Sequence, residues 1–145
     1  MGTVAAQAQQ SPLIGTWKQE LAKSKYDPVN LKPKTGLTIN IQAAGTGYKV
    51  TTDGTDVKGA PAHTEYTDAT EDGKDYAVQG SADCDSVAVK KIDANTRILV
   101  NKKSGTVVRM LRSVVSKDGK TLTLDAVGYN AQSVAFHAVT VYDKQ

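Results

Sequence analysis

From residue 35 onward, apolar and β-branched residues recur in short alternating runs, separated by turn clusters at intervals of about ten residues. Such spacing is typical of an all-β sandwich or barrel. The runs read "LTINI", "YKVTT", "AHTEYT", "DYAVQ", "SVAVKKI", "TRILVN", "VVRMLRSVV", "TLTLDAV" and "VAFHAVTVY". With "GTWKQE" at residues 15–20, they predict about ten strands.

The connections between the runs predict how the strands are ordered. Each run ends in a tight turn that is too short for a parallel crossover, so neighbouring strands should pair antiparallel. Only residues 21–34 leave room for a helical turn or a lid, and Pro28 and Pro33 keep any helix there short. We therefore expect residues 13–145 to form a single antiparallel up-and-down β-barrel of about 8–10 strands.

Three turns have the form of a tight hairpin loop, and this form predicts which residues pair. Each suits a three-residue loop built on a type I turn, with its glycine in the left-handed region. The turns are Glu71-Asp72-Gly73, Lys103-Ser104-Gly105 and Lys117-Asp118-Gly119. The resulting pairs are Tyr66 with Val78, Asp68 with Tyr76, Val100 with Val108, Ile98 with Met110, Val114 with Leu122, and Arg112 with Leu124.

These pairs predict which residues face the barrel interior, because paired residues share a face of the sheet. Tyr66 and Tyr76 should face inward, and His63 and Glu65 should face solvent. A continuous apolar inner face is expected through Ile98, Val100, Val108, Met110, Val114, Leu122, Leu124 and Ala126.

Arg112 is the one predicted inward residue that does not suit an apolar lining. A buried guanidinium needs a partner. It can pack on Trp17 and bond strand-end carbonyls, which would close the floor of the barrel, or it can anchor a ligand carboxylate. We favour the first alternative, because a barrel must be plugged at one end and Trp17 is the obvious plug.

A barrel of this size has room for packed side chains or for one small ligand. If a cavity exists, Tyr48, Tyr66 and Tyr76 would place hydroxyl groups in it. Its apolar walls would come from Val50, Met110 and Phe136. The same tyrosines can instead sit at the mouth of the barrel with their hydroxyl groups in water, and the sequence leaves both alternatives open.

Residues 1–12 show no alternation and are expected to be disordered. Ala6-Gln7-Ala8 has the small-x-small form of a signal-peptidase site, although the apolar core of a signal peptide is missing. We read Met1-Gly2 as an added start joined to the tail of a truncated signal. This interpretation predicts a periplasmic or secreted protein, and the alternative is an ordinary N-terminal tail.

Charge and cysteine content narrow the functional classes. Lys and Arg number 18 and Asp and Glu number 15, with no block of like charges that would mark a nucleic-acid groove or a membrane-binding stripe. No apolar run is long enough for a transmembrane helix. Cys84 is the single cysteine, so no internal disulfide forms, and the flanking Asp83 and Asp85 disfavour a thiolate. We interpret Cys84 as incidental.

No catalytic residue, metal site or cofactor is predicted. His63 and His137 fall on outward positions, without a nucleophile or carboxylate linked to either by local spacing. Ligand spacing for zinc is absent, and the glycines fall at turns rather than in a phosphate loop. The acidic stretch 68–75 lacks the terminal glutamate of a calcium loop.

The residues resemble those of a known group. A G-x-W triplet on the first strand, a strand meander and an Arg from a late strand resemble the lipocalins and fatty-acid-binding proteins of the calycin group. "IGTWKQELAKSKYDP", "DGKDYAVQG", "KKIDANTR", "SVVSKDGKTLTL" and "VYDKQ" are similar to small exported bacterial lipocalin-like proteins. The resemblance implies a barrel for a small apolar molecule and transfers structural roles to Gly15 and Trp17, with Arg112 as their partner.

The function expected from the sequence is non-enzymatic binding of a small, largely apolar molecule by a monomer or weak dimer. One alternative is an enzyme of the cyclase, isomerase or dehydratase type, with an inward Tyr as acid and Arg112 or Lys91 polarising a carbonyl. The other is a filled barrel that works through its outer surface as an envelope interaction module.

Overall fold

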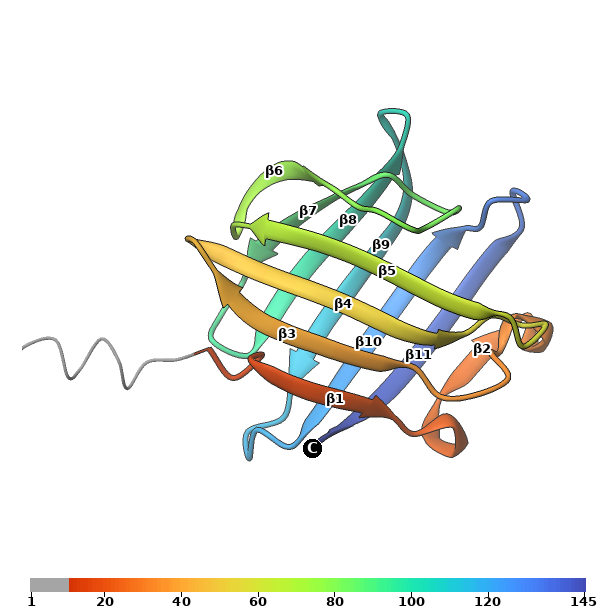
Figure 1. Cartoon of the computed structure of the whole chain (residues 1–145), viewed down its shortest axis with the longest axis horizontal. Coiled ribbons are helices and arrows are strands. Elements are labelled where there is room, and N and C mark those ends of the chain that lie inside the picture. The colour runs from red at the N-terminus through yellow and green to blue at the C-terminus, as the bar shows by residue number, and fades with distance from the viewer. Residues whose placement is uncertain (1–10) are drawn as a thin grey trace, which may run out of the picture.

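The computed structural model describes residues 11–145, which form one antiparallel sheet that curls into a barrel (Figure 1). Two short 3-10 helices, η1 (Leu21–Lys23) and η2 (Val29–Leu31), lie between β1 and β3. The strands are β1 (Gly15–Gln19), β2 (Lys25–Asp27), β3 (Thr38–Ala44), β4 (Gly47–Thr55), β5 (Pro61–Ala69), β6 (Asp72–Ala77), β7 (Ser86–Lys91), β8 (Thr96–Lys103), β9 (Thr106–Val115), β10 (Thr121–Tyr129) and β11 (Ala135–Lys144). The predicted fold class is confirmed, with eleven strands.

The predicted export signal falls within residues 1–10, outside the described residues, and it stays a prediction. In the part of the chain that the structure describes, neither short helix has the length or the apolar character needed to cross a membrane.

Strand order closes the barrel everywhere except at one seam. The order is β5-β4-β3-β1-β11-β10-β9-β8-β7-β6, and β2 pairs with the first half of β11, at residues 137–139. β1 joins the two halves, because it pairs with β3 on one side and β11 on the other. Within residues 11–145, the end strands meet through a single bridge, Glu65 with Gln79. We call this junction the β5–β6 seam.

Because the strands alternate in direction, successive connections lie at opposite ends of the barrel (Figure 1). We call the end where β1 begins the floor. The connections β3–β4, β5–β6, β7–β8 and β9–β10 lie there. The other end is the rim, and it carries the connections β1–β3, β4–β5, β6–β7, β8–β9 and β10–β11.

Trp17 occupies the floor and is fully buried. Its Nε1–H donates a hydrogen bond to the Leu13 carbonyl at 2.8 Å. Lys144, its partner across β1 and β11, places Nζ 5.4 Å from the centre of the indole ring as a cation–π contact. Gly15 has φ +145°, and a Cβ there would lie 2.8 Å from Lys144 Cε. Gly15, two residues before Trp17, therefore leaves space for Lys144, which covers the indole ring.

Around Trp17 the core is filled by side chains from both halves of the barrel. They include Ile39 and Ile41 from β3 and Val115, Leu122 and Tyr142 from the other half. Because these groups come from strands far apart in sequence, they tie the two halves together at the floor. The core of the protein therefore sits at this end.

A buried polar network holds the long β1–β3 connection. Gln19 Nε2 donates to the Tyr26 hydroxyl at 2.8 Å, and Gln19 Oε1 accepts the Leu37 N–H at 3.0 Å. Ser24 Oγ accepts the Val141 N–H at 3.0 Å. The connection is thereby bonded to β1, to the start of β3 and to β11.

The predicted inner face is wrong in β8 and β9, and the β9–β10 turn explains why. Its loop runs from Lys117 to Lys120, one residue longer than expected, because the Ser116 N–H bonds the Thr121 carbonyl. Leu122 therefore pairs with Val115, where Val114 was expected. One additional residue in the turn places the other side of β9 in the interior.

The β8–β9 turn also differs from the prediction. Ser104 and Gly105 have φ of +51° and +82°, as in a two-residue type I′ hairpin. A β-bulge lies beside the turn, at Asn101 and Lys102 of β8. Val100 consequently pairs with Met110, in place of Val108. The short turn and the bulge together leave the same residues of β8 and β9 on a common face as predicted. Because the face of β9 is reversed by the β9–β10 turn, both strands present to the interior the face opposite to the one expected.

Met110 and Arg112, predicted to face the interior, therefore lie on the outer surface. Met110 is 48% exposed, and Arg112 is exposed. Ile98 and Val100, their cross-strand partners, share that outer face. The inward positions are Arg97, Leu99, Asn101, Arg109, Leu111 and Ser113. The β10 part of the predicted face is correct, since Leu122 and Leu124 point inward and Ala126 is buried on the same side.

In the described chain, the one bridge of the β5–β6 seam, Glu65 with Gln79, has the register predicted for Tyr66 with Val78, but no ladder extends from the bridge to that pair. Tyr66 nevertheless faces inward, opposite Val50 of β4. His63 is exposed, as expected, and its Nδ1 lies 2.5 Å from Asp53 Oδ1.

Replacing Trp17 with alanine should lower the free energy of unfolding by about 3–5 kcal/mol, because it removes the largest buried side chain of the floor. Urea denaturation followed by far-UV circular dichroism measures this change, since the variant lacks the tryptophan needed for fluorescence. Ile92→Ala, at an exposed position, is the control and should stay within about 0.5 kcal/mol of the parent. Similar losses in the two variants would contradict the assignment of Trp17 to the floor.

Candidate functional site

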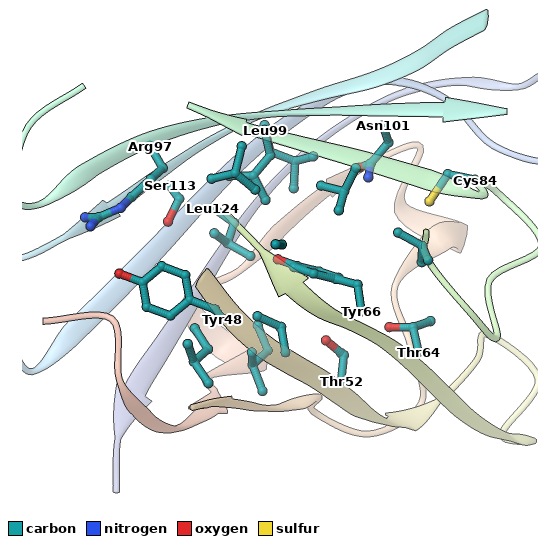
Figure 2. A pocket seen from close by; sticks show the side chains of 18 of the residues that line it. Tyr48, Thr52, Thr64, Tyr66, Cys84, Arg97, Leu99, Asn101, Ser113 and Leu124 are labelled. Carbon is teal, nitrogen blue, oxygen red and sulfur yellow. The ribbon is translucent and has the colours of Figure 1, made fainter. Parts of the chain in front are cut away.

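The barrel encloses a cavity of about 190 Å³ (Figure 2). Its walls are mainly aliphatic, with a few polar groups among them. The aliphatic side chains are Leu13, Ile39, Ile41, Val50, Val78, Val87, Val89, Leu99, Leu111, Leu122 and Leu124. An interior of this composition suits an apolar molecule.

β8 and β9 build one wall in three layers, because paired residues of the two strands share the inner face. Arg97 pairs with Ser113 at the floor side, and Leu99 pairs with Leu111 in the middle. Asn101 pairs with Arg109 toward the rim. The wall therefore has an arginine layer at each side of an apolar centre, and the two guanidinium groups have different surroundings.

The floor-side arginine, Arg97, is almost fully buried and completely engaged. Its Nε donates to Glu71 in a short ion pair, and Nη1 donates to the Ala94 carbonyl at 2.7 Å. A third bond reaches Ser11 Oγ at 3.4 Å. These partners balance the guanidinium charge, so Arg97 has a structural role at the floor.

Arg109, toward the rim, has only neutral partners among residues 11–145. Its Nε donates to Asn101 Oδ1 at 2.9 Å, and Nη2 lies 3.7 Å from Cys84 Sγ. Asn101 Nδ2 in turn donates to the Ser86 carbonyl at 3.3 Å, which fixes the amide. No carboxylate of the described chain lies within ion-pair distance of Arg109, so this cation lines the cavity without a counter-charge.

Cys84 takes part in this polar corner. It is buried, lies in the cavity wall, and its thiol can donate to Ser81 Oγ at 3.8 Å. The sequence interpretation of Cys84 as incidental did not foresee its place beside Arg109.

Tyr48 and Tyr66 project into the cavity from the same side of the barrel (Figure 2). The Tyr48 ring lies toward Arg97. No hydrogen-bond partner is found for the Tyr66 hydroxyl in the described part of the chain, so it is available to a bound molecule. Burial raises the pKa of Tyr66 well above its usual range, with a smaller contribution from Cys84. Tyr66 is therefore a neutral hydroxyl donor at any physiological pH.

Of the residues predicted to bind a ligand, Tyr48, Val50 and Tyr66 line the cavity. The other four do not. Tyr76 donates its hydroxyl to Asp72 at 2.8 Å outside the cavity, and Phe136 lies on β11 away from the lining. Met110 and Arg112 face outward, as described above. The ligand-binding roles of the three lining residues stay predictions.

The sequence analysis missed Arg97, Asn101 and Arg109 because it placed the opposite faces of β8 and β9 in the interior. Arg97, Leu99 and Asn101 alternate with Ile98 and Val100, and the more apolar set is normally the inner one. Only the actual length of the β9–β10 loop reverses that interpretation. No sequence signal that we used distinguishes this loop from a three-residue one.

The histidines and acidic residues form no further site in the described chain. His137 Nε2 lies 2.7 Å from Asp125 Oδ1 on the outer surface, and both side chains are about half exposed. Residues 11–145 contain no group of three potential metal ligands from His, Cys, Asp and Glu.

No protein-family model matches the chain, and no curated protein matches it in sequence. Among solved structures, the fold is similar to that of zebrafish ileal bile acid-binding protein, crystallised with cholic acid. The similarity has a TM-score of 0.56 at 14% sequence identity, and it covers 93% of this chain and 100% of the zebrafish chain. At this identity the comparison establishes a shared β-barrel fold.

Glu71→Gln should lower the free energy of unfolding by about 3 kcal/mol, because it leaves the buried Arg97 charge uncompensated. The matched control is Asp75→Asn, which breaks the exposed Lys102–Asp75 pair and should cost under about 1 kcal/mol. Chemical denaturation of the three proteins gives both values. An equal cost for the two substitutions would show that Arg97 does not depend on Glu71.

Stability should also fall at alkaline pH, because burial raises the pKa of Tyr142 to about 12. The pKa of a tyrosine in the unfolded chain is about 10. The contribution of Tyr142 to stability is therefore complete below about pH 10 and is lost as the pH rises to about 12. Urea unfolding at a series of pH values measures the decline. Tyr142→Phe should show a shallower decline, and an unchanged slope in that variant would remove Tyr142 as its cause.

Proposed function

We propose that the barrel binds a small, largely apolar molecule that carries an acidic group at one end. The observation behind this proposal is Arg109, a guanidinium in the cavity wall whose partners within the described chain are an amide and a thiol. A carboxylate would supply the missing counter-charge and accept charge-assisted hydrogen bonds. The aliphatic walls would hold the rest of the molecule.

The volume of the cavity limits the size of the occupant. An engineered cavity of about 150 Å³ in another protein stays dry and accepts benzene. The 190 Å³ here suits a molecule of one ring or a short hydrocarbon chain. The Tyr66 hydroxyl offers a second polar contact, which suits an oxygen-bearing group on the ligand.

The fold comparison supports the same class of function. The zebrafish protein is a bile acid-binding protein, so a barrel of this fold can hold a small organic acid. The proposal for this chain rests on its own cavity and on Arg109, since the two sequences are only 14% identical.

The two alternative functions have less support. The enzyme hypothesis used Arg112 or Lys91 to polarise a carbonyl, and both side chains are exposed. The filled-barrel hypothesis required an interior without a continuous cavity, whereas about 190 Å³ is present. We therefore favour a binding protein.

The proposal predicts that acids bind more tightly than neutral molecules of the same shape. Isothermal titration with trans-cinnamate against cinnamyl alcohol, and with octanoate against octanol, tests this difference. Arg109→Met should weaken binding of the acids by about 10- to 100-fold, as expected for a hydrogen-bonded charge, and should leave the alcohols nearly unchanged.

The matched control is Arg112→Met, which removes an arginine from the outer face of the same strand. It should bind acids as the parent does. Equal affinity of the parent for acids and alcohols, or an equal loss in the two arginine variants, would contradict Arg109 as the anchor.

A further inference from the structure

The outer face of β9 and β10 carries a strip of exposed apolar side chains. Of the eight large apolar side chains that are exposed in residues 11–145, four lie on these two strands. Met110 and Val127 are cross-strand partners and are 48% and 50% exposed. Val107 and Tyr129 are exposed on the same two strands nearer the rim. A contiguous exposed apolar area of this kind is typical of an interaction surface.

The strands on either side widen this strip. On β8, Val100 lies beside Met110, and Ile98 lies beside Arg112. On β11, Val139 lies beside Asp125 of β10. Ile98, Val100 and Val139 are partly exposed on the outer face. We call the outer face of β8 to β11 at these residues the apolar strip.

The apolar strip has one cation and one anion at its centre. Arg112 of β9 and Asp125 of β10 are directly opposite each other, one outward position from Met110 and Val127 toward the floor. They form no ion pair with each other, because Asp125 Oδ1 lies 2.7 Å from His137 Nε2 on the other side. Arg112 has no ion-pair partner among residues 11–145. Its guanidinium group, which is exposed, can therefore bond a carboxylate of another molecule.

A two-fold axis along the strands, midway between β9 and β10, makes the apolar strip complementary to itself. Each residue of β9 then faces, in the second copy, the residue of β10 that is its own cross-strand partner. Met110 faces the second copy's Val127, and Arg112 faces the second copy's Asp125. By the same symmetry, Ile98 of β8 faces the second copy's Val139.

The shape of the barrel favours the same arrangement. Its wall is convex, so two barrels touch most extensively when their strands run nearly parallel (Figure 1). The pair next to Arg112 and Asp125 toward the floor is Val114 with Thr123, which adds no charge. Lys90 on β7 and Lys25 on β2 continue the same row beyond β8 and β11, where the two convex walls diverge. The like charges of these lysines therefore lie outside the contact.

We propose that two copies of the chain associate through the apolar strip, about a two-fold axis between β9 and β10. The occupant is a second copy because an isologous contact needs a self-complementary surface, and Arg112 and Asp125 give the strip that property. A lipid bilayer suits the strip poorly, because both charged groups would enter its apolar phase. The contact between two convex walls is small, so the dimer is weak and depends on concentration.

Sedimentation velocity of the full chain at a series of concentrations tests the proposal. The parent should shift from monomer to dimer as its concentration rises. Arg112→Glu places a carboxylate against the second copy's Asp125, and Asp125→Arg places a guanidinium against the second copy's Arg112. Each substitution alone should weaken association by about tenfold or more, because like charges then face each other.

A mixture of the two charge variants tests the pairing between copies. In the mixed dimer, the carboxylate introduced by Arg112→Glu faces the guanidinium introduced by Asp125→Arg. The unchanged Asp125 of the first copy faces the unchanged Arg112 of the second. The mixture should therefore dimerise about as well as the parent, although neither variant does so alone. An effect of either substitution within its own chain cannot produce this result.

The apolar contact and the controls need separate variants. Met110→Ser with Val127→Ser should weaken the dimer, and Ile92→Ser, comparably exposed at the floor, is its matched control. Lys49→Glu is the matched control for charge, because it breaks an exposed ion pair with Glu65 on the opposite wall (Figure 1). Both controls should associate as the parent does. Circular dichroism and thermal melting establish that each variant is folded.

Three results would overturn the proposal. The parent would stay monomeric at every concentration, which would assign the apolar strip to another kind of partner. The charge variants would dimerise as the parent does, which would place the contact on another face. In the third, the mixture would stay as monomeric as each charge variant alone, which would exclude the axis between β9 and β10. Trans-cinnamate should bind the strip variants as it binds the parent, because their substituted residues lie outside the cavity lining, so this test is independent of the proposed function.

Discussion

The buried guanidinium of Arg97 is the constraint on which the closure of this barrel depends. A permanent charge in a low-dielectric interior is tolerated only with a full set of partners. Those partners come from three separate places: Ser11 before β1, Glu71 in the β5–β6 turn and Ala94 in the β7–β8 turn. The β5–β6 seam has one backbone bridge in the described chain, and the Arg97–Glu71 pair ties the turn at the floor end of this seam to β8. Electrostatics thus joins the sheet where backbone hydrogen bonding is sparse.

Arg109 lies in the same wall as Arg97 but differs from it in having no charged partner within the described residues. The two guanidinium groups lie on paired strands, separated by the Leu99–Leu111 layer. Arg97 is neutralised and fixed, whereas Arg109 is held in place by Asn101 with its charge uncompensated within residues 11–145. The two ends of the cavity therefore differ: the arginine at the floor side is neutralised by an ion pair, and the arginine toward the rim has no counter-charge within the described residues. An elongated molecule with one acidic end would bind in a single orientation.

The sequence predicted the architecture correctly because its signals are local. Alternation, tight turns and the absence of crossover connections are enough for an antiparallel meander, and Gly15 and Trp17 lie where the first strand meets the floor. The lining was harder to predict, because side-chain facing depends on counting every residue of a turn. One additional residue at Lys117–Lys120 exchanged Arg112 for Ser113 and Met110 for Leu111 in the interior.

The β5–β6 seam also bears on the association of one molecule with another. An open sheet edge presents unpaired N–H and C=O groups that invite strands from other chains, the first step toward fibrous aggregation. Here the two edge strands face each other across a narrow junction, so each shields the other. β5 begins at Pro61, which has no N–H to donate, and contains Asp68 with φ +56°, which interrupts a flat edge. β6 is short and carries Asp72, Lys74 and Asp75. The seam therefore interrupts the backbone pairing of the barrel without presenting a long, flat strand edge that a neighbouring chain could extend.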